Sequence, residues 1–204
     1  MAERAISTAL DEFEERQFVF RISQDPIAYL SFADEIGSTD NHPLISTIFD
    51  PAYNYLGPGN FLWTSVHTDE GEPAAIVATR SIDGDLEELI RTGRLWGTKR
   101  PVQVPSTMFV YPNDAPRLTG VTVYRGGMYV RAKFRNCGIA RPLVQATVAL
   151  CDRLFRPEWH FAFRFADISR QRLRLFGYDE CFPVFRQAHR KGLDPQRRLD
   201  RAET

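Results

Sequence analysis

Long apolar runs and a net charge are the two features that this sequence lacks. Its 204 residues hold 26 Lys and Arg against 26 Asp and Glu. No stretch reaches the roughly 20 consecutive apolar residues of a membrane-spanning helix. Residues 1–16 are acidic and have no apolar core, which argues against a secretory signal and against a transit peptide. We therefore expect a cytoplasmic protein with no membrane partner.

Cysteine and histidine are also scarce. The sequence has three widely separated cysteines and four histidines, without a CxxC pair or any spacing typical of metal ligands. This pattern disfavours a structural zinc site and a disulfide framework. We expect no metal.

The zero net charge is the sum of two halves of the chain that carry opposite charges. Residues 1–102 contain 8 basic and 17 acidic residues, a balance of −9, and residues 103–204 contain 18 and 9, a balance of +9. Such asymmetry suggests that the second half meets an anionic partner. Because 43% of the residues are hydrophobic and 12% aromatic, the chain can form a core. We expect one domain over residues 1–190 and a polar, Arg-rich tail over 191–204.

Hydrophobic periodicity and turn residues predict an alternation of helices and strands. The expected helices are 3–16, 26–36, 85–92, 141–155 and a short one ending near Gly177; the expected strands are 18–22, 61–66, 74–79, 120–130, 159–165 and 182–185. Asp25 and Pro26 suit the N-cap and first position of the second helix. Four prolines between 93 and 118 predict an irregular insertion, typical of a lid or binding loop.

The segment from Tyr129 to Leu143 is the most informative one for function. It predicts a strand that runs through a glycine-containing turn directly into a helix. Unpaired N–H groups and the helix dipole make such a helix start an anion site, for which phosphate is the usual ligand. The flanking sequence from Ala115 to Cys151 has six basic residues and no acidic one. A solvated cationic face beside an ordinary turn is the equally weighted alternative.

Residues Arg135 to Ala140 (RNCGIA) resemble the (Q/R)xxGx(G/A) motif of the GCN5-related N-acetyltransferases. In that family the motif joins the fourth strand to the third helix, as it does in the predicted element order. Leu173 to Tyr178 resembles the family's later YxxxGF pattern, and the hairpin at 61–79 its second and third strands. The resemblance implies an α/β fold: a mixed, mostly antiparallel central sheet flanked by helices, with an insertion between the third and fourth strands.

The resemblance also implies acetyl-CoA as co-substrate. The amides around the motif would bind its pyrophosphate, and the end of the fourth strand would pair with the pantetheine arm. The implied cofactor-binding residues are Met128, Tyr129, Val130, Arg135, Asn136, Cys137, Gly138, Ile139, Ala140 and Arg141. In such enzymes an amine attacks the thioester directly in a ternary complex, and the protein positions the reactants and assists proton transfer.

The catalytic residues of the family are not conspicuous in this sequence. Leu173 stands where the family often has a tyrosine acid, and the fourth strand has no glutamate base. His160, Glu158 and Tyr124 are the candidate substitutes for this base, although a histidine on a strand is more often structural. Only one strand follows Gly177 where the family has two, so a second copy in a homodimer would be one source of the missing strand.

Three functions remain open at this point. The first is an acetyl-CoA-dependent N-acyltransferase acting on a small-molecule or peptide amine. The second is a catalytically silent relative that binds CoA or another ligand as a regulatory module. The third is a nucleic-acid-binding protein that uses its Arg-rich half, which ranks below the others because no recognition motif is present.

Overall fold

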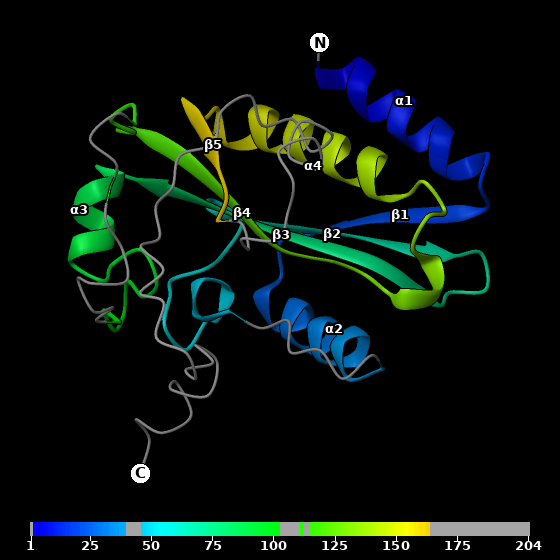
Figure 1. The fold of residues 1–204 in the computed structure, drawn as a ribbon, viewed down its shortest axis with the longest axis horizontal. Helices are drawn as coiled ribbons and strands as arrows, with labels where there is room; N and C mark the ends of the chain where they lie inside the picture. Colours follow the sequence, from blue (N-terminus) through cyan, green and yellow to red (C-terminus); the bar gives the residue numbers. More distant parts are fainter. Residues whose placement is uncertain (1, 40–45, 103–110, 112–114, 164–204) are drawn as a thin grey trace, which may run out of the picture.

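The computed structural model describes residues 2–39, 46–102, 111 and 115–163 (Figure 1). Its centre is a five-stranded sheet with the order β1-β2-β3-β4-β5. The strands are β1 (Phe18–Ser23), β2 (Phe61–Thr68), β3 (Pro73–Asp83), β4 (Val121–Val130) and β5 (Trp159–Phe161). The helices are α1 (Ala2–Glu14), α2 (Pro26–Thr39), α3 (Leu86–Arg91) and α4 (Ala140–Phe155), with short 3-10 turns η1 (Thr47–Phe49) and η2 (Ala132–Phe134).

The sheet is mixed but mostly antiparallel, which confirms the expected fold class. Strands β1 to β4 pair antiparallel with their neighbours. Among the described strands, only β5 runs parallel to its neighbour, through Thr122–Tyr124 of β4. The segment between β3 and β4 carries α3, as the expected insertion does. Among the described residues, no helix is long and apolar enough to cross a membrane.

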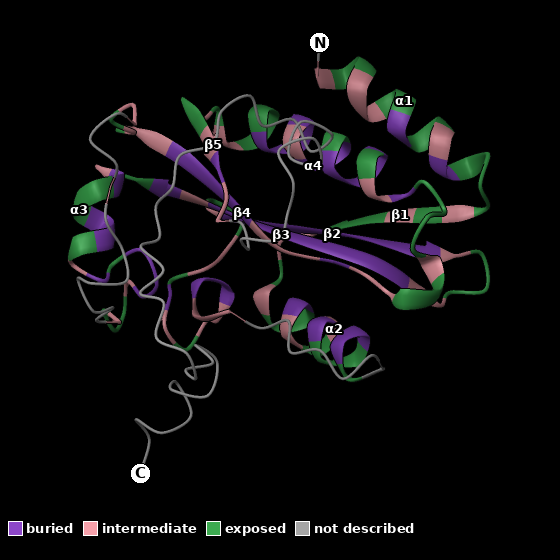
Figure 2. Cartoon of the chain, in the orientation of Figure 1, coloured by how far each residue is buried: buried purple, intermediate pink, exposed green. Residues whose placement is uncertain are grey.

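Helices cover both faces of the sheet. Helices α1 and α4 lie on one face, and α2 and η1 lie on the other (Figure 1). Residues of β3 alternate between the two layers: Ala75 and Val77 pack with α1 and α4, whereas Ile76 and Ala78 pack with α2. The central strands are therefore buried on both sides, as Figure 2 shows in purple.

The helix starts follow from local chemistry. Oδ1 of Asp25 accepts hydrogen bonds from the N–H groups of Ile27 and Ala28 at 2.8 and 3.2 Å, which confirms the expected cap of α2. Asp85 caps α3 in the same way, through the N–H groups of Glu87 and Glu88. Each carboxylate satisfies donors that the first helical turn leaves unpaired.

Strand β5 is shorter than the alternation at 159–165 predicts. Its pairing ends at Phe161, yet Phe161 and Phe163 still pack together, with ring centroids 5.9 Å apart. The alternating pattern therefore predicted where aromatic side chains pack, and this stretch is longer than the stretch that pairs with β4 by hydrogen bonds. The predicted helix ending near Gly177, the 173–178 pattern, the strand at 182–185 and the tail at 191–204 lie outside the described residues.

Candidate functional site

The backbone of the turn between β4 and α4 enters the left-handed region, which favours small residues such as glycine. After η2 the chain passes through Asn136 and Gly138, whose φ angles are +71° and +75°. Glycine adopts the second of these without the strain that a Cβ would impose. Helix α4 then begins at Ala140, and the preceding Ile139 offers no side-chain cap. The side chain of the cap residue therefore satisfies none of the N–H groups at the helix start.

Several amides at this helix start have no acceptor. Among the described residues, the N–H groups of Gly138, Ile139, Ala140 and Arg141 make no hydrogen bond. The Cys137 N–H does, because it donates to the Phe134 carbonyl at 3.3 Å inside the turn. Unpaired donors at the positive end of a 16-residue helix can bind an anion. This local geometry agrees with the expectation from sequence.

Two of the basic side chains near the turn share one carboxylate from the β2–β3 turn. Glu72 accepts a hydrogen bond from Nη1 of Arg131 at 2.7 Å and another from Nζ of Lys133. The Lys133 bond, followed by the Arg131 bond, holds the pKa of Glu72 below its ordinary value. The segment from Ala115 to Cys151, which has no acidic residue of its own, is thus paired in the folded structure with an acidic residue from another segment. Because one carboxylate offsets only one of the two positive charges, Arg131, Lys133 and Glu72 together keep a net positive charge beside the turn.

Further positive charge near the turn comes from three exposed arginines, of which Arg16 is paired with Glu12 at 3.5 Å. Arg135 lies over the Tyr129 ring at 5.9 Å and donates to the Val130 carbonyl, and Arg141 lies in the first turn of α4. Arg16 is the residue that sequence reasoning missed: a Cβ at Gly138 would lie 3.2 Å from its Nε. Arg16 follows α1, far away in the chain, so no local pattern could have connected it with the turn.

Strand β4 carries a bulge where the expected acyl carrier would approach. Its pairing with β3 shifts so that Gly127 and Met128 together face Val77. On its other edge, the described pairing with β5 ends at Tyr124. Gly126, Gly127 and Met128 have no β5 partner among the described residues, and all three are half-buried. Within the described ranges, no strand therefore pairs with this short stretch of backbone edge.

The three catalytic candidates are not brought together. Tyr124 packs in the cluster on the α2 face, with its ring 5.5 Å from that of Phe49. His160 lies on the α4 face, where its Nε2 is 2.7 Å from Oδ1 of Asp152. Glu158 is exposed at the start of β5, beside Gly120. No group of three or more metal-ligating side chains occurs in the described ranges.

The chain resembles known proteins in structure and not in sequence. Neither a family model nor a curated protein matches the sequence. Among solved structures, the chain is similar to an aminoglycoside antibiotic 6'-N-acetyltransferase from Acinetobacter baumannii. The two are 14% identical, the similarity covers 86% of this chain and 99% of that chain, and the TM-score is 0.47. At this level of identity and TM-score the likeness assigns neither an activity nor a substrate to this chain.

Proposed function

We propose that this chain is an acyl-CoA-dependent N-acyltransferase that uses acetyl-CoA and a small-molecule or peptide amine. The observation that carries the proposal is the start of α4. It has no side-chain cap, and among the described residues the N–H groups from Gly138 to Arg141 are unpaired. The motif at Arg135 to Ala140 and the mostly antiparallel sheet support it. We propose further that residues 1–190 form a single domain of this kind.

In this proposal the pyrophosphate of CoA binds in front of α4. The N–H groups of Gly138 to Arg141 donate to its oxygens, and the side chains of Arg135, Arg141 and Arg16 supply positive charge. Asn136 and Cys137 shape the turn behind it. The pantetheine arm lies along Met128, Tyr129 and Val130, next to the half-buried bulge of β4.

The chemistry is a direct transfer. The amine nitrogen attacks the thioester carbonyl carbon, the C–S bond breaks, and CoA leaves as a thiol once the amine proton has been removed and the sulfur protonated. His160, held by Asp152, is the proposed base, with Glu158 as its alternative. Tyr124, on the opposite face and close to Gly126, is the third candidate for the same role of base.

Turnover with a panel of amines tests the proposal. Acetyl-CoA is mixed with the protein and each amine, and the released thiol is measured. We expect turnover with at least one amine, and its loss in a variant that combines Arg135→Glu with Gly138→Asp. Gly71→Asp is the matched control, because Gly71 also has a positive φ, +89°, but lies in the β2–β3 turn. Full activity in the double variant would overturn the proposed site.

A catalytically silent CoA-binding module is the second candidate. It is favoured by the separation of the three catalytic candidates, of which Tyr124 and His160 lie on opposite faces of the sheet. Such a module would be stabilised against heat by CoA but would release no thiol with any amine. Thermal stabilisation by CoA and thiol release with amines, measured together, therefore separate the two functions.

A further inference from the structure

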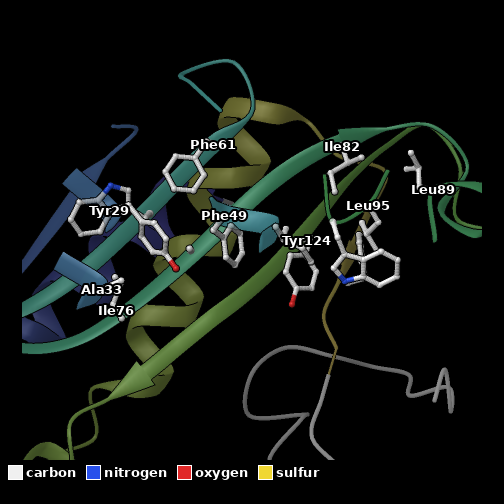
Figure 3. Close-up of a cluster of buried hydrophobic side chains, with 14 of the residues drawn as sticks. Tyr29, Ala33, Phe49, Phe61, Ile76, Ile82, Leu89, Leu95 and Tyr124 are labelled. Atoms are coloured by element: carbon white, nitrogen blue, oxygen red, sulfur yellow. The ribbon is translucent and has the colours of Figure 1, made fainter. Parts of the chain in front are cut away.

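The Tyr29 hydroxyl is a buried polar group without a partner. Tyr29 lies in α2 and is 0% exposed, and its hydroxyl makes no hydrogen bond among the described residues. Aromatic rings surround it: Phe49, Phe61 and Trp63 lie with centroids 5.6 to 6.1 Å from its own. Figure 3 shows Tyr29 in this cluster, with Phe49 between it and Tyr124. A phenylalanine would fill the same space without leaving a hydroxyl unsatisfied.

The hydroxyl lies directly against the bulge of β4. A Cβ at Gly127 would be 3.0 Å from the Tyr29 oxygen, and a Cβ at Gly126 would be 2.6 Å from the Tyr124 oxygen. Both glycines are half-buried, so the two hydroxyls reach the sheet at the margin of the core. Any larger residue at either position would collide with a hydroxyl. The two hydroxyls therefore take the space that a side chain at either glycine would need.

The Tyr29 hydroxyl acts as a donor rather than as a base. Burial, and after it the neighbouring Tyr124, raises its pKa far above the ordinary value for tyrosine. It therefore stays protonated at any physiological pH and has a proton to donate. Among the described residues, no acceptor oxygen reaches this hydroxyl.

We propose that Tyr29 donates a hydrogen bond to the thioester carbonyl oxygen of the bound acyl-CoA. This inference rests on the proposed function, which lays the pantetheine arm along the same stretch of β4. When the amine attacks, negative charge develops on that carbonyl oxygen, and a preoriented donor in a dry site stabilises it. Tyr29 comes from a helix that precedes the motif by about a hundred residues, so its role is independent of the pyrophosphate turn.

Two ligands that differ only at the carbonyl test this role. Acetyl-CoA carries the thioester oxygen, whereas S-ethyl-CoA has a methylene group in its place. Their dissociation constants are measured by calorimetry with the wild type, with Tyr29→Phe and with Tyr55→Phe. Tyr55 is the matched control, because this residue is 68% exposed, whereas Tyr29 is fully buried.

We expect Tyr29→Phe to weaken acetyl-CoA binding relative to S-ethyl-CoA by about threefold to tenfold, as the loss of one hydrogen bond predicts. S-ethyl-CoA should bind this variant and the wild type equally, and Tyr55→Phe should change neither constant. The unfolding temperature of Tyr29→Phe should stay the same or rise, because an unsatisfied hydroxyl is removed. A merely structural tyrosine would not change the ratio of the two constants.

The failures are distinguishable. If both ligands bind and their ratio is the same in Tyr29→Phe as in the wild type, the role of Tyr29 is overturned and the proposed function stands. If neither ligand binds the wild type, the proposed function fails, and the role of Tyr29 fails with it.

Discussion

Single residues set the electrostatics of the turn before α4. Glu72 draws Arg131 and Lys133 toward the β2–β3 turn, while Arg16 approaches Gly138 from the end of α1. The charge available to an anion therefore differs from the charge that the local sequence displays. The backbone amides, rather than the basic side chains within the turn, are the main donors that the structure provides.

The ion pairs of Glu72 should make stability depend on pH in the acid range. A carboxyl whose folded-state pKa is lowered contributes stability that is complete above its ordinary pKa, 4.5, and is lost as the pH falls through the lower folded-state value. Glu72→Gln should therefore lower the unfolding temperature at about pH 7, and the difference from the wild type should shrink toward about pH 3.

Thermal unfolding measured across this pH range checks the expectation. Glu70→Gln is the control, because it removes the same charge from an exposed neighbour in the same turn that forms no ion pair among the described residues. A constant difference between Glu72→Gln and the wild type at all pH values would contradict the assignment.

At the scale of elements, α4 is fixed to the sheet by buried hydroxyls as well as by apolar packing. Oγ1 of Thr147 donates to the Leu143 carbonyl at 2.7 Å, so the 2.7 Å contact between Thr64 and Thr147 has Thr64 as donor. Both side chains are 0% exposed. The N-terminal turn of α4, which holds the candidate site, is thereby positioned against β2.

This donor order predicts unequal costs for two similar substitutions. Thr147→Val leaves the Thr64 hydroxyl buried without its acceptor, which costs about 1–3 kcal/mol. Thr64→Val leaves Thr147 bonded to Leu143 and costs about 0.5–1.5 kcal/mol. The double variant should lose less than the sum of the two, because the pair is broken only once. Denaturant unfolding of the three variants gives these values, and a larger cost for Thr64→Val would contradict the donor order.

At the scale of the whole molecule, the two oppositely charged halves neutralise each other through specific contacts. Ion pairs join acidic residues of the first half to basic residues of the second: Asp85 to Arg117, Glu72 to Arg131 and Lys133, and Glu3 to Arg153. Part of the charge asymmetry is thus internal to the fold. Beside Gly138 lie the arginines at positions 16, 135 and 141, of which Arg16 also pairs with Glu12.

Sequence patterns predicted what is local and missed what is not. The turn at Gly138, the helix after it and the Asp25 cap each depend on residues within a few positions, and each was predicted correctly. The approach of Arg16 to Gly138 and of Tyr29 to Gly127 depends on how α1 and α2 pack on the sheet. Such contacts join residues about a hundred positions apart, where periodicity carries no information.

Calorimetric titration of CoA into the wild type, Gly138→Asp and Gly71→Asp tests the central claim, that the turn before α4 binds the phosphates of CoA. Both substitutions force a side chain into a positive φ, +75° and +89°, so their backbone strain is matched. Only Gly138→Asp sets a carboxylate before the unpaired amides. We predict that it weakens CoA binding by about tenfold to a hundredfold, since one or more charge-assisted hydrogen bonds are lost, and that Gly71→Asp binds like the wild type. Equal affinity for CoA in all three proteins would contradict the claim.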